Sequence, residues 1–186
     1  MPAVPPFRSD RVRVGVSACL LGQSVRYDGG HKRDAWLVET LGRLVEFVPV
    51  CPEFELGLGV PRASLRLESH AEGIRLIAPA SAIDHTVAMR TYAHARVVAL
   101  TREHLSGYVL KSNSPSCGMD RVQIFNSHGT PSRSGRGLFA AALIARFPDL
   151  PVEEEGRLAD ARIREDFVAR ILAYHRSGGL PARRAT

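Results

Sequence analysis

The sequence predicts an α/β fold: one compact, Rossmann-like domain with a mostly parallel sheet flanked by helices. The chain has 186 residues and shows neither an internal repeat nor a low-complexity block, which favours a single core. Apolar runs of strand length alternate with segments of helical spacing, the order expected of a parallel sheet with helical crossovers. Apolar residues make up 45% of the chain and charged residues 24%, a composition typical of soluble globular proteins.

The first elements predict a βαβ unit. Residues 12–22, VRVGVSACLLG, predict a core strand that runs into a glycine turn. Residues 34–45 carry apolar side chains at helical spacing, and residues 46–50, EFVPV, predict a second strand. Pro49 has no N–H to donate to a neighbouring strand, which argues against the last residues of this second strand.

A hairpin and a long helix are expected next. Residues 64–69 and 73–78 alternate apolar and polar side chains about a short polar turn, which predicts two paired strands. Ser81 and Asp84 stand three residues apart like the two members of a capping box, so we expect a long helix to begin there. This helix is expected to end near His104.

The remaining elements complete the predicted sheet and its covering helices. Residues 107–111, GYVLK, predict a third core strand, and residues 121–125, RVQIF, predict a further one. Residues 126–137 are rich in serine, glycine and arginine and predict a loop. Two helices are expected to follow, at residues 138–147 and at about residues 158–175, where apolar side chains recur at helical spacing.

The two ends of the chain differ from this core. We expect residues 1–11 to be a flexible leader, residues 12–176 to form the α/β domain, and residues 177–186 to be a tail or linker. No apolar run approaches the roughly 18 residues of a membrane span, and the start lacks the apolar segment of a signal peptide. We therefore expect a cytoplasmic protein that has no membrane partner.

The charge of the chain is moderately basic, with 25 lysines and arginines, 19 acidic residues and a net charge of +6. Such an excess is typical of a solvated surface, and it also suits an anionic partner such as a nucleotide or RNA. Three cysteines are an odd number in a chain without a secretion signal, so a disulfide framework is not expected.

Each cysteine lies just past the carboxyl end of a predicted core strand. Cys19 follows the first strand, Cys51 the second, and Cys117 the third, within the octet KSNSPSCG. In an open α/β sheet such strand ends meet at the crevice where ligands bind, so the three thiols can share one site. A free cysteine is also a common small core residue, but these three have serine, glycine, proline and glutamate neighbours. We therefore predict that they converge.

Three thiols without C-x-x-C pairs do not match a structural zinc site, which closes four ligands around the metal. Ligation by sulfur alone suits an iron–sulfur cluster, which four cysteines normally hold, so three would leave one iron open to a substrate. The sequence has neither the zinc deaminase pattern nor the glycine and lysine spacing of a phosphate-binding loop.

Three strings of the sequence, VSACLLGQSVRYDG, PVCPEFELGLGVPR and LKSNSPSCG, occur in this order and precede the helix GRGLFAAAL. Together they resemble the TudS-like family of desulfidases, long catalogued as a domain of unknown function, over roughly residues 12–155. The resemblance implies that Cys19, Cys51 and Cys117 hold a [4Fe-4S] cluster in which one iron has no protein ligand. It also implies hydrolysis of the thiocarbonyl of a thiolated pyrimidine, with release of sulfide and no transfer of electrons.

The implied reaction also requires a general acid or base. Glu53, two residues after a cysteine, is the carboxylate best placed to act as general acid or base. We prefer it to Glu55, which is expected to face solvent, although a short helical turn would exchange the two roles. Lys111 and Ser112 are expected to assist catalysis by donating hydrogen bonds to the cluster sulfides or to the pyrimidine.

Four further residues are candidates for substrate binding: Arg26, Asp28, Asn113 and Ser114. Asp28 and Arg26 follow the first cysteine and are expected to contact the base or a phosphate, whereas the alternative for the DGG sequence is a tight turn. Asn113 and Ser114 can likewise be turn residues that bind their own backbone. His31 is expected to be a helix cap or a surface residue.

The substrate prediction depends on which branch of the family the chain resembles. Residues 94–125 and 164–176 resemble members that carry a second, C-terminal domain and act on thiouridine in tRNA. Single-domain members act on free thiolated bases or nucleotides. One small domain with a charge of +6 offers little surface to grip folded RNA, so we expect free nucleotides to be the better substrate and tRNA to be weaker and salt-sensitive. Arg133 and Arg136 are expected to contact phosphate.

Two other functions remain open at this point. One is an RNA-binding module without catalysis, which the net charge favours and which leaves the three cysteine loops unexplained. The other is a hydrolase that uses Cys117 as its nucleophile together with a nearby histidine.

Overall fold

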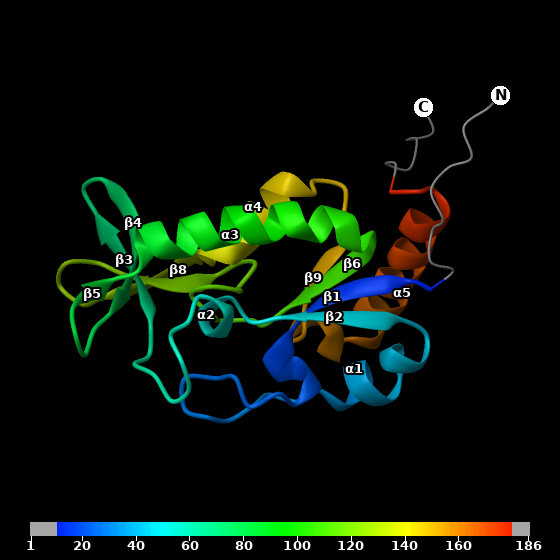
Figure 1. Cartoon of the computed structure of the whole chain (residues 1–186), viewed down its shortest axis with the longest axis horizontal. Helices are drawn as coiled ribbons and strands as arrows, with labels where there is room; N and C mark the ends of the chain where they lie inside the picture. The colour runs from blue at the N-terminus through cyan, green and yellow to red at the C-terminus, as the bar shows by residue number, and fades with distance from the viewer. Residues whose placement is uncertain (1–10, 180–186) are drawn as a thin grey trace.

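The computed structural model of the protein describes residues 11–179, which form two sheets with helices packed on them (Figure 1). Of the predicted leader and tail, residues 1–10 and 180–186 lie outside the described residues. No helix in the described part of the chain is long and apolar enough to cross a membrane.

The predicted parallel α/β sheet is confirmed. Its four strands run parallel in the order β2-β1-β6-β9. Their bounds are β1 (Arg13–Ser17), β2 (Glu46–Val50), β6 (Leu105–Leu110) and β9 (Val152–Glu154). Pro49 lies inside β2 opposite Val16, and it fits because β2 is an edge strand with one side that needs no donors. The sequence did not predict β9.

Helices cover both faces of this sheet, as expected. Within residues 11–179 the α-helices are α1 (Ala35–Glu39), α2 (Pro52–Glu55), α3 (Thr86–Leu100), α4 (Leu138–Arg146) and α5 (Ala161–Arg176). Tyr108 and Leu110 of β6 pack with side chains of α3 and α4, whereas the intervening Val109 packs with side chains of α1 and α5. This alternation along a fully buried strand places β6 at the centre of the core.

A second sheet, which the sequence did not predict as a unit, lies beside the first (Figure 1). Its order is β5-β4-β3-β7-β8. The strands are β3 (Arg66–His70), β4 (Gly73–Ala78), β5 (Ile83–Asp84), β7 (Val122–Phe125) and β8 (Pro131–Gly135). The predicted hairpin is β3 with β4, and they pair antiparallel. The expectation of a loop at residues 126–137 was wrong in part, because β8 pairs with β7 there.

The helix boundaries also differ from the prediction. The helix predicted at residues 34–45 is shorter, because α1 ends at Glu39 and a separate 3-10 turn (Leu41–Arg43) follows. The long helix α3 begins at Thr86 and not at the predicted capping box, because Asp84 belongs to β5 and pairs with Ile77 of β4. The Asp84 carboxylate instead accepts a hydrogen bond from the Thr86 N–H. The last helix, α5, begins at Ala161, a few residues after the predicted start, and a short 3-10 turn (Arg157–Ala159) precedes it.

Candidate active site

The carboxyl ends of β1, β2 and β6 open into one cavity of about 340 Å³, and all three cysteines line it. Cys19 lies in a 3-10 turn (Ala18–Leu21) that follows β1 directly, and Cys51 lies between β2 and α2. Cys117 lies in the loop between β6 and β7. The convergence predicted from the sequence is therefore present in the fold. It arises because parallel strands deliver their following loops to the same edge of the sheet.

All three cysteines are free thiols, with Cys19 and Cys117 buried and Cys51 partly buried. Burial, with a smaller contribution from Cys51, raises the pKa of Cys19 to about 11. Burial likewise raises the pKa of Cys51 and, well above its ordinary value, that of Cys117. Within residues 11–179 no three histidine, cysteine or acidic side chains are grouped closely enough to hold a single metal ion. The three thiols come from three different loops of the cavity wall.

The octet KSNSPSCG is shaped by hydrogen bonds to its own backbone. The Ser114 hydroxyl oxygen accepts hydrogen bonds from the N–H groups of Ser116 and Cys117 at 3.2 and 3.0 Å. Asn113 adopts a left-handed conformation with φ of 58°. Both residues line the cavity, so the turn-forming role and the predicted substrate-facing position apply to the same side chains.

The Cys117 loop is also docked onto the start of α4. The Ser116 carbonyl accepts hydrogen bonds from the N–H groups of Phe139 and Ala140 at 3.0 and 3.2 Å. A Cβ on Gly137 would lie 2.4 Å from the Ser116 carbonyl oxygen and 2.7 Å from the Cys117 nitrogen. Only glycine allows this close approach, so α4 fixes the position of the third cysteine.

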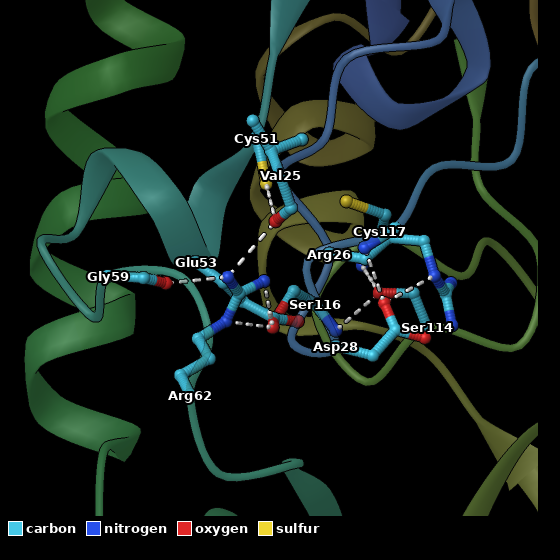
Figure 2. A network of polar contacts seen from close by, with 11 residues as sticks. Val25, Arg26, Asp28, Cys51, Glu53, Gly59, Arg62, Ser114, Ser116 and Cys117 are labelled. Carbon is cyan, nitrogen blue, oxygen red and sulfur yellow. Dashed lines mark hydrogen bonds and ion pairs between the residues drawn. The ribbon is translucent and has the colours of Figure 1, made fainter.

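The predicted general acid or base, Glu53, lines the cavity, and both of its carboxylate oxygens have partners (Figure 2). Its Oε2 accepts hydrogen bonds from Nε and Nη2 of Arg62 at 3.1 and 2.9 Å. Its Oε1 accepts a hydrogen bond from the Ser116 hydroxyl at 2.9 Å. The carboxylate is thus held between two of the cysteine loops, and its orientation is fixed before any substrate arrives.

The other carboxylate of this helix, Glu55, points elsewhere and does not line the cavity. Its Oε2 accepts hydrogen bonds from the Tyr92 hydroxyl at 2.6 Å and from Arg96 Nε at 2.9 Å, both on α3. Its Oε1 accepts a hydrogen bond from the Cys51 N–H at 3.1 Å. Glu55 therefore connects the second cysteine to α3.

The predicted catalytic pair, Lys111 and Ser112, lines the cavity, and both residues contact a carboxylate that the sequence did not identify and that does not line it. Glu155, which follows β9, forms an ion pair with Lys111 Nζ. The same carboxylate accepts hydrogen bonds from the Ser112 N–H at 2.7 Å and the Ser112 hydroxyl at 2.8 Å. The Lys111 N–H in turn donates to the Ser17 hydroxyl oxygen at 2.9 Å. Glu155, directly after β9, thus fixes the position of Lys111 and Ser112 at the start of the octet.

Of the two predicted substrate-binding residues after Cys19, Arg26 lines the cavity and Asp28 does not. The Asp28 carboxylate accepts a hydrogen bond from the Gly30 N–H at 3.0 Å and lies 3.5 Å from Arg26 Nε. The hydrogen bond from Gly30 is the main cause that lowers the pKa of Asp28. His31 is exposed, and its Nδ1 accepts a hydrogen bond from the Arg33 N–H.

Two basic residues that line the cavity were not identified from the sequence, and the two arginines predicted to contact phosphate do not line it. Lys32 and Arg62 line the cavity; Arg62 is the last residue of the string PVCPEFELGLGVPR, but the sequence indicated a role for neither residue. Arg133 of β8 donates a hydrogen bond to the side chain of Asn113 at 3.3 Å, which places it at the rim. Arg136 donates to the Met119 carbonyl at 2.8 Å and does not line the cavity.

The cavity does not offer the pair that a cysteine-nucleophile hydrolase needs. None of the seven histidines, all of which lie in the described part of the chain, lines the cavity. Burial raises the pKa of Cys117, whereas a nucleophilic thiol requires a lowered pKa. This alternative therefore has no support in the site.

Together, the fold and the cavity define the class of the protein. A parallel α/β sheet that brings three thiols and a fixed carboxylate to one cavity at its carboxyl edge is the architecture of an α/β enzyme. The chain belongs to the 2-thiouracil desulfurase family, whose model matches residues 14–155. That match includes all three cysteines and Glu155, and it confirms the family resemblance found in the sequence.

One curated protein and one solved structure are also similar to the chain. It is 33% identical over 144 residues to the protein YbbK of Bacillus subtilis (strain 168), with 69% of this chain and 87% of YbbK covered. The solved structure of a [4Fe-4S]-dependent thiouracil desulfidase, TudS, superposes with a TM-score of 0.64 at 30% identity. The superposition covers 84% of this chain and 99% of the TudS chain.

Proposed function

We propose that this protein is a desulfidase that holds a [4Fe-4S] cluster through Cys19, Cys51 and Cys117, with one iron left without a protein ligand. The observation that carries the proposal is that three strand ends bring three thiols to one cavity. Thiolates are the usual ligands of iron–sulfur clusters. The three cysteines come from three different loops and line one cavity, an arrangement in which each can bind a different iron of a cluster.

We further propose that the reaction is hydrolytic. The C=S bond of the substrate breaks, the oxygen of water becomes the new carbonyl oxygen, and sulfur leaves as sulfide, so no electron donor is required. When bound, the cluster would supply an iron that acts as a Lewis acid toward the substrate sulfur. Glu53 would accept the proton of the attacking water at Oε1, the oxygen that Arg62 does not contact.

The remaining wall residues would bind and orient the substrate. Lys111 would donate to the carbonyl oxygen of a thiolated pyrimidine, and Ser112, Asn113 and Ser114 lie next to it on the cavity wall. Arg26, supported by Asp28, would contact a phosphate. The volume of about 340 Å³ lies at the lower end of the range for small-molecule sites.

We infer that the substrate is a free thiolated base or nucleotide, such as 2-thiouracil or 4-thiouridine monophosphate. Thiouridine in tRNA would be a weaker substrate, because a base in folded RNA must first be drawn out of its stack. Three free thiols also suit the reducing cytoplasm, where we place the enzyme.

The test is reconstitution with iron and sulfide in the absence of oxygen, followed by analysis of both elements and by an assay of sulfide release from 2-thiouracil. We expect a brown protein that contains iron and acid-labile sulfide and releases sulfide from the substrate. A colourless preparation with full activity would overturn the proposal.

A further inference from the structure

Arg62 is a buried arginine whose side chain donates several hydrogen bonds at the site. It lies in the connection between α2 and β3, its side chain is only 6% exposed, and it lines the cavity. A buried guanidinium needs several acceptors to replace the water that it loses. Its partners therefore indicate what it holds in place.

Arg62 uses the two sides of its guanidinium for different partners, as Figure 2 shows. Nε and Nη2 donate to the Glu53 carboxylate. Nη1 donates to the carbonyl oxygens of Val25 at 3.0 Å and Gly59 at 2.9 Å. The Val25 carbonyl is also the acceptor for the Cys51 thiol, with 3.7 Å between sulfur and oxygen.

These contacts connect all three cysteine loops. Val25 belongs to the loop that follows Cys19, and Glu53 belongs to the helix that follows Cys51. Through Glu53 the connection continues to Ser116, the neighbour of Cys117. Arg62, directly and through Glu53, thus joins three segments that are far apart in the sequence and that each carry a thiol.

We propose that Arg62 is a positioning residue that holds the three cysteine loops at the spacing required by a cluster, and that it does so before the cluster binds. The inference rests on the proposed function for its consequence, cluster retention, but the loop contacts exist in the protein itself. Arginine suits this role because its planar fork offers five N–H donors in fixed directions, whereas lysine has a single nitrogen on a flexible stem.

The alternative is that Arg62 acts only through Glu53, by orienting that carboxylate. Two variants separate these roles. Arg62→Lys removes the contacts to the Val25 and Gly59 carbonyls, whereas Glu53→Gln leaves them in place and weakens only the ion pair. The Arg62 N–H donates to the Tyr27 carbonyl at 2.9 Å, and this backbone bond persists in the lysine variant, so the comparison isolates the side chain.

The first measurement uses the metal-free full chain and amide hydrogen exchange. The reporters are the N–H groups of Arg26 and Gly29, which donate to carbonyls of Gly30 and Arg26 within the first cysteine loop. We expect Arg62→Lys to speed their exchange by about tenfold or more, the effect of losing a hydrogen bond from a charged donor. Glu53→Gln should leave their exchange near that of the wild type. The matched control is Arg75→Lys, at an exposed ion pair on β4.

The second measurement follows loss of iron from the reconstituted protein to a chelator without oxygen. We expect the iron of Arg62→Lys to be lost about tenfold faster than that of Glu53→Gln or the control. Arg62→Gln, which buries no charge, serves where the lysine variant fails to fold. Wild-type behaviour of the Arg62 variant in both measurements, or equal effects in the Arg62 and Glu53 variants, would overturn the inference. Failure of the wild type to bind iron would instead overturn the proposed function, and the exchange data would still decide the role of Arg62.

Discussion

Glu53 and Glu55 are two residues apart on the single turn of α2, yet their carboxylates serve different parts of the molecule. Glu53 faces the cavity between Arg62 and Ser116. Glu55 faces α3 and also accepts a hydrogen bond from the Cys51 N–H. A turn of this length places the two side chains in different directions, so one short helix supplies a candidate catalytic group and a structural anchor.

Because the two carboxylates lie on one turn, Glu53→Gln and Glu55→Gln form a matched pair of variants. Glu53→Gln should keep the cluster and lose about a hundredfold in rate, the usual contribution of a general acid–base group. Glu55→Gln should keep most of the rate but lower the free energy of unfolding by about 1 kcal/mol, because its partners on α3 are retained with weaker hydrogen bonds. Steady-state sulfide release and thermal unfolding of both variants check this. The opposite ranking of rates would show that Glu55 is the catalytic carboxylate.

Each cysteine should be required for the cluster. Replacing Cys19, Cys51 or Cys117 by serine should remove the brown colour, the iron and the sulfide release, because each thiol is expected to bind a different iron. Iron and sulfide analysis of the three single variants, reconstituted side by side, is the measurement. A loss of activity confined to Cys117→Ser, with iron unchanged in the other two, would favour a nucleophilic cysteine.

Glu155 should contribute to both stability and rate, because its carboxylate binds Lys111 and Ser112. Glu155→Gln leaves the partly buried Lys111 ammonium without its ion pair, so we expect the free energy of unfolding to fall by about 2 kcal/mol and the rate to drop about tenfold. Glu165→Gln, on an exposed position of α5, is the control and should change neither quantity appreciably. Wild-type kinetics in Glu155→Gln would show that the position of Lys111 is not important for the reaction.

Lys32 should contribute to the binding of nucleotides but not to the binding of free bases. It lines the cavity and is exposed, and its ammonium group forms no hydrogen bond or ion pair with the described residues, so this group is available to a phosphate. Lys32→Ala should raise KM for 4-thiouridine monophosphate about tenfold and leave KM for 2-thiouracil unchanged. Equal effects on both substrates would place Lys32 at the base and not at the phosphate.

The proposed preference for free substrates over tRNA can be tested by varying the salt concentration. Sulfide release from 4-thiouridine monophosphate should exceed that from thiolated tRNA, and only the tRNA reaction should fall steeply between low and high salt. The two substrates are compared at equal thiouridine concentration. Efficient and salt-resistant turnover of tRNA, with none of the mononucleotide, would contradict the assignment of a free nucleotide as substrate.

The sequence was sufficient to predict the parallel sheet and the meeting of the three thiols. Both follow from local patterns combined with a topological rule: apolar strands separated by helices pair in parallel, and their carboxyl ends share one edge. Cys19 and Cys51 follow their strands directly, so their convergence needed no knowledge of tertiary contacts.

Tertiary contacts explain what the sequence did not reveal. Residues 152–155, VEEE, have the composition of a solvated acidic segment, yet they contain β9 and Glu155. Glu153 and Glu154 are buried because Arg170 pairs with the first and the Met119 N–H donates to the second. In the same way, β8 carries serines and an arginine on an exposed strand and lacks the apolar alternation that predicts strands.

The two sheets divide the cavity wall between them. The cysteines follow strands of the parallel sheet, whereas Ser64 and Leu65, which also line the cavity, lead directly into β3 of the second sheet. Substitutions in the part of the wall that leads into the second sheet can therefore change the shape of the cavity without changing the strands that the cysteines follow. A mutant library restricted to these two positions, selected for growth on differently sized thiolated bases, can alter which molecules are admitted while every thiol keeps its place.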